Sequence, residues 1–375
     1  WVKGAKHIQL ISNFMDLMNI NNRLLLCFIL ACGTTFWLIP SIVNIARSKR
    51  LFAEPNDRGS HTENTPTLGG LAIFTGVALS TLLFFNFTAI PKFQYVIAGL
   101  LIIFFTGIKD DLTGITPFRK FVAQITAVLI IVMFGAIRFT HLHGFIGIFE
   151  INNHVGLVIS VIAIVGITNC FNLMDGIDGL SASLGILASV VFGFWFYMVG
   201  DYDWAMLCIG MTGALMAFFY FNVFSKKYKI FMGDTGSLIL GFIMAIMVIR
   251  FNESNIGLSG MWAIRAAPAV SFGIIMVPVF DTLRVFVTRI FRNVSPFSPD
   301  RTHIHHYLLD LGLSHFQATL VLFITGILFV AVSWYLRNLT VAWLLMVLLA
   351  LGTVLSAIPI FLVERRKKIR MTDDR

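Results

Sequence analysis

The sequence predicts an all-α polytopic membrane protein, and its composition and its apolar runs carry this prediction. Of its 375 residues, 57% are hydrophobic and 13% are charged, whereas a soluble domain carries roughly 25% charged residues. The mean hydropathy is +0.85. Apolar runs of about 20 residues recur along the chain, and each is long enough to cross the hydrocarbon layer as a helix.

We expect about 11 transmembrane helices and a single membrane domain at residues 24–362. It follows an N-terminal segment (1–23), in which Met15 or Met18 is the expected start, and precedes a basic tail (363–375). The expected spans cover residues 24–45, 68–86, 94–108, 121–138, 155–170, 180–199, 204–222, 236–250, 267–288, 316–336 and 339–362.

Most of the 28 Lys and Arg residues fall in loops on the same side as the C-terminal tail. The positive-inside rule therefore places the C-terminus in the cytoplasm and the N-terminus outside. This topology accounts for the net charge of +9, so we expect no nucleic-acid partner. The four cysteines lie in or beside apolar spans without CxxC spacing, which favours core residues over a disulfide or zinc site.

Carboxylates and imidazoles gather on this cytoplasmic side. A carboxylate at the bilayer centre would cost about 2.5–3.5 kcal/mol or more, and these groups avoid that position. The set comprises Asp110, Asp111, Asp175, Asp178, Asp234, Asp281, Asp300 and Asp310 with His61, His303, His305, His306 and His315.

Two of the motifs place carboxylates close together. In "KDDLTG" (109–114), adjacent like charges require a cation or a raised pKa, although a solvated acidic turn has the same pattern. In "NLMDGIDGL" (172–180), Asn172, Asp175 and Asp178 are three residues apart and share one face of a helical turn. An ordinary Asp-Gly turn with a helix cap is the structural alternative.

Two further motifs are rich in glycine or histidine. In "FMGDTGS" (231–237), Asp234 is either part of a capped turn or a metal ligand beside N–H groups that suit phosphate. "THIHH" (302–306) allows a zinc site, a phosphate site or a structural cluster. For Asp281 and Arg284 we expect an ion pair. Taken together, oxygen ligands near glycine-rich backbone favour Mg²⁺, with Mn²⁺ as the alternative, and phosphoryl transfer to a lipid-borne acceptor.

These motifs resemble those of the polyprenyl-phosphate N-acetylhexosamine-1-phosphate transferases. The resemblance rests on "TPTLGG", "DDLTG", "FNLMDGIDGL", "FMGDTGS" and "PFSPDRTHIHH", and it covers about residues 40–315. The last motif is similar to the bacterial branch that starts O-antigen, enterobacterial common antigen or teichoic acid linkage units. The sequence departs from many relatives at Thr62, Glu63 and Asn64, where a basic residue is usual, so Arg58 or His61 would have to serve.

The resemblance implies that N-acetylhexosamine-1-phosphate passes from a UDP-sugar, with UDP-GlcNAc preferred, to undecaprenyl phosphate with release of UMP. It makes Asp110 the base for the lipid phosphate, Asp111 its support or that of the metal, and Asp175 and Asp178 the lining of the nucleotide pocket; we take all four as catalytic. The implied Mg²⁺ ligands are Asp234 and Asn172. The implied substrate-binding residues are Asn172, Gly176, Phe231, Arg301, His303, His305 and His306.

The expected location is the bacterial inner membrane, with the site facing the cytoplasm and with membrane lipids and a second copy of the chain as further partners. Three alternatives are a phospho-MurNAc-pentapeptide transferase, a membrane transporter and a scaffold protein. A transporter usually carries ionisable groups near the bilayer midplane, and this pattern is not seen here.

Overall fold

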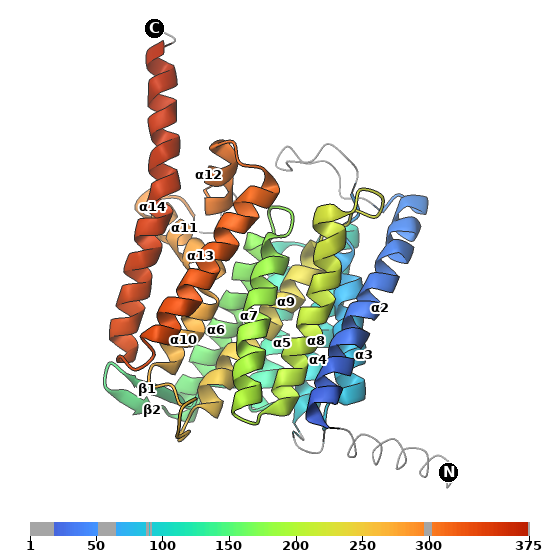
Figure 1. The fold of residues 1–375 in the computed structure, drawn as a ribbon, viewed down its shortest axis with the longest axis vertical. Helices are drawn as coiled ribbons and strands as arrows, with labels where there is room; N and C mark the ends of the chain where they lie inside the picture. Colours follow the sequence, from blue (N-terminus) through green and yellow to red (C-terminus); the bar gives the residue numbers. More distant parts are fainter. Residues whose placement is uncertain (1–18, 52–64, 88–89, 91, 296–301, 374–375) are drawn as a thin grey trace.

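The chain folds into a bundle of helices that run mostly side by side, with a short β-hairpin at the lower end in Figure 1. The computed structural model describes residues 19–51, 65–87, 90, 92–295 and 302–373. In chain order, the elements are α2 (Ile20–Ser48), α3 (Gly69–Phe84), α4 (Phe93–Thr113), α5 (Pro117–Met133), β1 (His141–Phe145), β2 (Ile148–Glu150), α6 (Asn153–Met174), α7 (Leu180–Met198), α8 (Tyr202–Phe219), the π-helical turn η1 (Tyr220–Phe224), α9 (Gly233–Ser254), α10 (Ala267–Ile274), α11 (Met276–Phe291), α12 (Ile304–Asp310), α13 (His315–Tyr335) and α14 (Val341–Asp373).

Each expected span coincides with a helix or, at residues 267–288, with the pair α10 and α11. Seven of the described helices are long and apolar enough to cross a membrane, and the bent pair raises the number to eight. The prediction of an all-α polytopic membrane protein is confirmed at this level, and the count of eleven stays a prediction. Figure 1 shows α2 beginning at the lower end and α14 ending beyond the upper end; which end faces the cytoplasm also stays a prediction.

α9 is the central helix of the bundle. Its residues 235–249 are buried on every side, as expected for a helix that is apolar all round. It packs against α3, α4, α6 and α7. The first turn of α9 therefore lies among the ends of several other helices, and Asp234, which belongs to this turn, lies between them.

α10 and α11 meet at an angle of 88°, so the expected span 267–288 is not one straight helix. Pro278 lacks the N–H that the carbonyl of Ile274 would need for the helix to continue. The same proline is tolerated in the first turn of α11, where no such bond is required. The bend directs α11 toward the upper end of the bundle.

The β-hairpin was not expected from the sequence. β1 and β2 pair antiparallel at the lower end of the bundle, opposite the end that carries the clustered carboxylates. The His143 ring nitrogen Nε2 lies 3.1 Å from the carbonyl oxygen of Asn252, which ties the hairpin to the end of α9.

The beginnings of α3 and α9 lie directly against each other. Gly69 N donates to Phe231 O and Gly70 N to Met232 O, both at 2.9 Å. A Cβ atom on Gly70 would overlap the backbone nitrogen of Gly236. The motifs "TPTLGG" and "FMGDTGS" are therefore packed backbone to backbone, and glycine at position 70 is required by this close approach.

The contact between α3 and α9 predicts that Gly70→Ala destabilises the protein. Overpacking at such a site costs about 1–3 kcal/mol, so the melting temperature of the purified protein in detergent should fall. Gly33→Ala is the matched control, because a Cβ on Gly33 in α2 meets no atom within 4 Å. A Gly70→Ala protein as stable as Gly33→Ala would contradict the packing of α3 on α9.

Candidate active site

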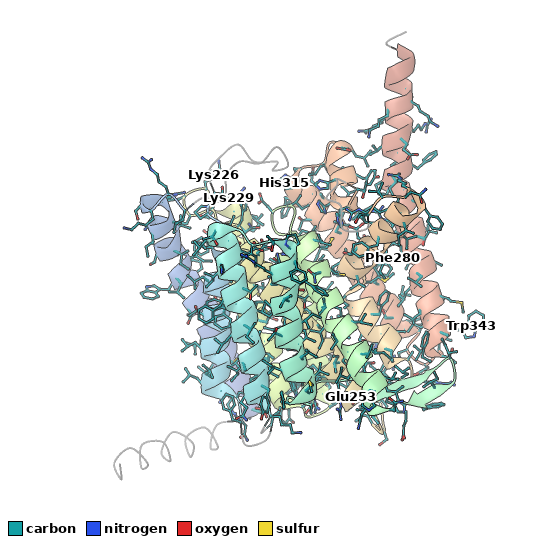
Figure 2. All side chains as sticks on the ribbon, turned by 180° about the vertical axis from the view of Figure 1, so that it is seen from behind. Lys226, Lys229, Glu253, Phe280, His315 and Trp343 are labelled. Carbon is teal, nitrogen blue, oxygen red and sulfur yellow. The ribbon has the colours of Figure 1, made fainter. Side chains whose placement is uncertain are left out.

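Polar side chains from separate elements meet at the upper end of the bundle. They come from the ends of α4 and α6, the beginnings of α5 and α9, and α11 with α12. Figure 2 shows Lys229 and His315 at this end, while Glu253 lies at the opposite end. Arg301, one of the expected phosphate ligands, lies outside the described residues, as do Arg58, His61 and Asp300.

A tight turn joins α4 to α5 and determines where their polar groups lie. Gly114 ends α4 with a φ of +65°, and Pro117 occupies the first turn of α5. Asp110 Oδ1 accepts from Ile115 N at 2.9 Å, which fixes this carboxylate against the turn. The turn brings Lys120, on the first part of α5, beside Asp110.

Lys120 lies at the centre of a cluster formed with Asp110, Asp234 and Asn172, which we call the acid–lysine cluster. Its ammonium lies 3.0 Å from Asp110 Oδ2, contacts Asp234 Oδ1, and donates to Asn172 Oδ1 at 3.3 Å. Burial opposes the charge on Lys120, but the two carboxylates prevail and raise its pKa. Asn172 Nδ2 also donates to Asp234 Oδ1 at 2.6 Å.

Asp111 faces a different set of partners from its neighbour Asp110. Its Oδ1 accepts from Asp234 N at 2.7 Å, and its Oδ2 accepts from Thr235 N at 3.0 Å and Thr235 Oγ1 at 2.5 Å. Burial raises the pKa of Asp111 to about 6, against the lowering effect of these hydrogen bonds. Asp111 therefore caps the first turn of α9 and positions Asp234, while Asp110 faces Lys120.

Asp175 lies directly after α6, and its pKa is raised more than that of any other described carboxylate at this end of the protein. Burial, followed by the nearby charge of Asp234, raises its pKa to about 7, and a hydrogen bond with Ser181 opposes the shift. A carboxyl group with such a pKa exchanges its proton near neutral pH, which suits acid or base chemistry.

Asp178 belongs to a second group of charges. Its Oδ2 lies 2.7 Å from Lys229 Nζ and 3.5 Å from His315 Nδ1. The same Lys229 ammonium lies 5.8 Å from the centre of the Phe231 ring. In such an arrangement the cation can contact a nucleotide phosphate, and the aromatic ring beside it can contact the base.

The histidine segment is anchored by a buried carboxylate. Asp281, with 2% of its surface exposed, accepts from Arg284 Nη2 at 2.7 Å and lies 2.8 Å from His303 Nδ1. The ion pair expected between Asp281 and Arg284 is therefore present. Ile304 N also donates to Asp281, at 3.2 Å, so this carboxylate holds the beginning of α12.

The three expected histidines have different surroundings. His303 is committed to Asp281, whereas His305 is buried against Gly176, where a Cβ atom would lie 2.5 Å from His305 Nε2. Burial and the neighbouring His306 lower the pKa of His305 to about 3, so its imidazole is neutral at physiological pH. Gly176 therefore allows the "DGIDG" turn to contact the histidine segment directly.

The acid–lysine cluster gathers oxygen ligands around one cation. The oxygens of Asp110, Asp234 and Asn172 converge on the Lys120 ammonium, which shows that the pocket suits positive charge. Mg²⁺ takes oxygen ligands, usually one or two carboxylates together with substrate phosphates. Among the described residues, no group of three or more His, Cys, Asp and Glu side chains is arranged to hold a metal ion, so the zinc alternative gains no support.

Lys120 and Lys229 were not singled out from the sequence. The motifs contain more acidic than basic residues, and buried carboxylates need counter-charges. This excess could have indicated that nearby lysines belong to the site. Lys120 follows the acidic turn and Lys229 precedes "FMGDTGS", so each lies next to an acidic motif in the sequence.

Comparison with known proteins bears directly on this site. The chain is 31% identical over 323 residues, 86% of its length and 87% of the relative's, to a probable undecaprenyl-phosphate N-acetylglucosaminyl 1-phosphate transferase of Bacillus subtilis. It is 27% identical over 347 residues, 91% of each chain, to the undecaprenyl-phosphate α-N-acetylglucosaminyl 1-phosphate transferase of Yersinia pestis. The decaprenyl-phosphate N-acetylglucosaminephosphotransferase of Mycolicibacterium smegmatis is 32% identical over 295 residues, 72% of each chain. The model of glycosyl transferase family 4 matches residues 93–252.

The chain belongs to glycosyl transferase family 4. The resemblance to polyprenyl-phosphate N-acetylhexosamine-1-phosphate transferases is thereby confirmed. The stretch that matches glycosyl transferase family 4 runs from α4 to α9 and contains the whole acid–lysine cluster with Asp111, Asp175 and Asp178. The histidine segment lies beyond this stretch.

The raised pKa of Asp175 predicts how stability depends on pH. Its pKa is about 7 in the folded protein against an ordinary 3.8, so the fold favours the protonated form. The contribution to stability is complete below the ordinary pKa and is lost as pH rises through about 7. Asp175→Asn should therefore flatten the fall of the melting temperature between about pH 4 and 7, the interval between the ordinary and the folded pKa.

The matched control for Asp175→Asn is Asp310→Asn, which replaces an exposed carboxylate on α12. This variant should keep the wild-type dependence of melting temperature on pH. An unchanged slope in Asp175→Asn would contradict the assignment of the raised pKa to Asp175.

Proposed function

We propose that the protein transfers N-acetylglucosamine-1-phosphate from UDP-N-acetylglucosamine to undecaprenyl phosphate and releases UMP. The observation that carries this proposal is the acid–lysine cluster at one end of an apolar helical bundle, in a chain whose relatives are named as N-acetylglucosaminyl 1-phosphate transferases. The location supports access by a water-soluble donor from one side and by a lipid phosphate from the bilayer. We place this side in the cytoplasm and the protein in the bacterial inner membrane.

The reaction forms one P–O bond and breaks another. An oxygen of the lipid phosphate attacks the β-phosphorus of the donor, and the bond from this phosphorus to the bridging oxygen breaks, so that UMP leaves with that oxygen. In this proposal Asp110 accepts a proton from the lipid phosphate, and the Lys120 ammonium, 3.0 Å from Asp110 Oδ2, neutralises phosphate charge. Asp111 keeps α9 and Asp234 in place by capping the helix.

The nucleotide is proposed to bind over the second group of charges. Lys229 reaches both Asp178 and the ring of Phe231, so it can contact a donor phosphate while the ring supports the uracil. His305, neutral and buried beside Gly176, can donate a hydrogen bond to the sugar or the diphosphate without adding charge. Asp175, near its pKa, lies between this region and the acid–lysine cluster.

Mg²⁺ is proposed as the metal ion, with Asp234 and Asn172 as the residues that would hold it. When bound, it supplies neutralisation of charge on the donor diphosphate. In this arrangement Lys120 keeps the carboxylates from repelling one another before the substrates bind. The polymer that this lipid-linked sugar starts, O-antigen or another envelope polysaccharide, is a further proposal from the histidine motif.

Asp110→Asn should lower kcat for UMP release. The asparagine cannot accept the proton, and general-base catalysis contributes about 10²–10⁴-fold. The assay uses purified protein with undecaprenyl phosphate, Mg²⁺ and a panel of UDP-sugars, and it reads UMP and the lipid-linked product. Asp310→Asn should keep the wild-type kcat.

Two outcomes of this assay would overturn the proposal. UMP release with UDP-MurNAc-pentapeptide alone would assign the protein to the peptidoglycan reaction. No UMP from any donor, with folded protein and lipid present, would remove the transferase assignment and make transport assays the next measurement.

Removal of divalent metal should abolish UMP release, and Mg²⁺ should restore it. Asp234→Asn should raise the Mg²⁺ concentration needed for half-maximal activity, because one carboxylate of the site is lost. Ser237→Ala is the matched control, since Ser237 accepts from the same Asn172 at 2.8 Å but carries no carboxylate. Full activity in EDTA would exclude Mg²⁺ from the reaction.

A further inference from the structure

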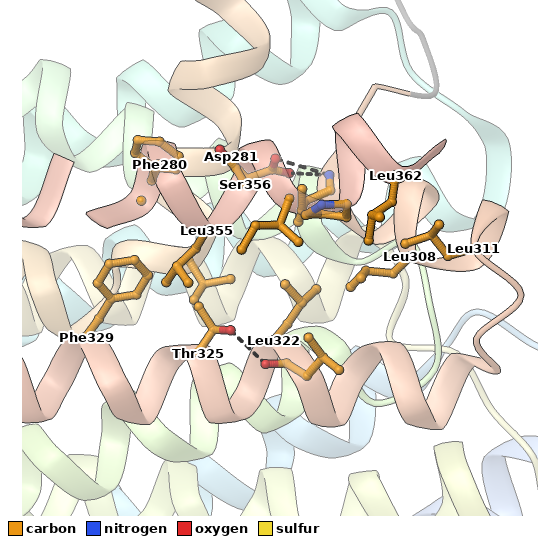
Figure 3. Close-up of a pocket in the computed structure, with 16 residues that line it drawn as sticks. Phe280, Asp281, Leu308, Leu311, Leu322, Thr325, Phe329, Leu355, Ser356 and Leu362 are labelled. Carbon is orange, nitrogen blue, oxygen red and sulfur yellow. Dashed lines mark hydrogen bonds between the residues drawn. The ribbon is translucent and has the colours of Figure 1, made fainter. Parts of the chain in front are cut away.

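A cavity of about 300 Å³ lies between α11, α12, α13 and α14, apart from the acid–lysine cluster. Figure 3 shows its lining, which is mainly aliphatic and aromatic and includes Leu308, Leu322, Phe329, Leu355 and Leu362. An apolar cavity of about 150 Å³ holds a benzene ring, so this one has room for about a dozen aliphatic carbons.

The few polar groups on its wall have partners within the protein. Thr325 Oγ1 donates to Val321 O at 2.8 Å, and Ser356 Oγ donates to Thr353 O at 3.1 Å. The carboxylate of Asp281 accepts hydrogen bonds from Arg284 Nη2 and from Ile304 N at the start of α12. The dashed lines in Figure 3 mark the contact with α12. A ligand in this cavity therefore finds apolar surface and is not required to satisfy a polar group.

The cavity opens where α13 and α14 face outward. Val321, Ile358 and Leu362, which line it, have 41%, 52% and 40% of their surfaces exposed. On helices long and apolar enough to cross a membrane, these side chains face lipid. The opening therefore admits a hydrocarbon chain from the bilayer.

Positive charge borders the end of the cavity that points toward the candidate active site. Arg366 Nη1 donates to the carbonyl oxygen of Leu311, a lining residue, at 2.8 Å. About 20 residues cross the hydrocarbon layer, so a span that starts at Val341 ends shortly before Arg365 and Arg366. α14 continues as a helix beyond the bundle (Figure 1). The cations that follow its span would therefore lie at the level of lipid headgroups.

We propose that this cavity binds one acyl chain of an anionic phospholipid, with the headgroup phosphate on Arg366. Aliphatic lining, an opening to the bilayer and a guanidinium at the rim match the two halves of such a lipid. The site is distinct from the transferase site and its occupancy does not depend on the proposed reaction. Since Ile304, Leu308 and Leu311 form one wall, the bound chain would support the face of α12 opposite its histidines.

The test uses the full chain in lipid nanodiscs of phosphatidylcholine that contain a phosphatidylglycerol with a diazirine on its acyl chain. After irradiation, mass spectrometry of peptides locates and quantifies the label. We expect labelling of α13 and α14 at the cavity, and unlabelled phosphatidylglycerol should compete for it.

Two matched pairs of variants refine this test. Ser356→Trp fills the cavity and should remove the labelling, whereas Ala357→Trp places the same side chain on the exposed neighbouring position and should not. Arg366→Gln should reduce labelling about fivefold, as expected for one cation near lipid phosphates, whereas Arg365→Gln should not. If Ser356→Trp fails to fold, the pair at Arg366 and Arg365 still tests the proposal.

Three outcomes would overturn the proposal. Equal labelling by a diazirine phosphatidylcholine would show that no anionic headgroup is recognised. Displacement of the label by undecaprenyl phosphate at equal concentration would make the cavity part of the acceptor site. Labelling that is indifferent to both Ser356→Trp and Arg366→Gln would show that the lipid binds elsewhere.

Discussion

The capping of α9 by Asp111 is the interaction on which the site depends. α9 begins packed against α3 and α4, and Thr235 in its first turn is buried, so the free N–H groups of this turn need an acceptor from the protein. Asp111 supplies both of its oxygens to Asp234 and Thr235. This contact fixes the end of α4 against the start of α9, and the close approach of α3 at Gly70 completes the same junction. The position of Asp234 is a consequence of this structural requirement.

The two adjacent aspartates therefore have separate tasks. Because α4 is helical through Thr113, consecutive side chains point in directions about 100° apart, and Asp110 faces α5 when Asp111 faces α9. Lys120 then bridges Asp110 and Asp234 across the gap between these helices. Repulsion between like charges, which the sequence alone suggests for this pair, is relieved by giving each carboxylate its own partner.

Much of this arrangement follows from the sequence, and the remainder depends on tertiary contacts. Long apolar runs locate the helices. The charge of the loops places Asp110, Asp175 and Asp234 at one end of the bundle. Both signals are local in the sequence. The hairpin at His141 depends on packing, so a polar loop gave no sign of it. The bend before Met276 has a local signal in Pro278, but the proline alone does not give the angle of 88° between the two helices. Lys120 and Lys229 could not be distinguished from ordinary basic loop residues until the fold brought carboxylates to them.

The anchoring of the histidine segment has a mechanical consequence. α12 is attached through Asp281 to α11, and it lies outside residues 93–252, which the family shares. The acid–lysine cluster is built entirely within that shared stretch. The histidine segment and the acid–lysine cluster are therefore held in place by different buried carboxylates, Asp281 and Asp111. A displacement of α12 can thus change one side of this end of the bundle while the junction of α4, α5 and α9 stays in place.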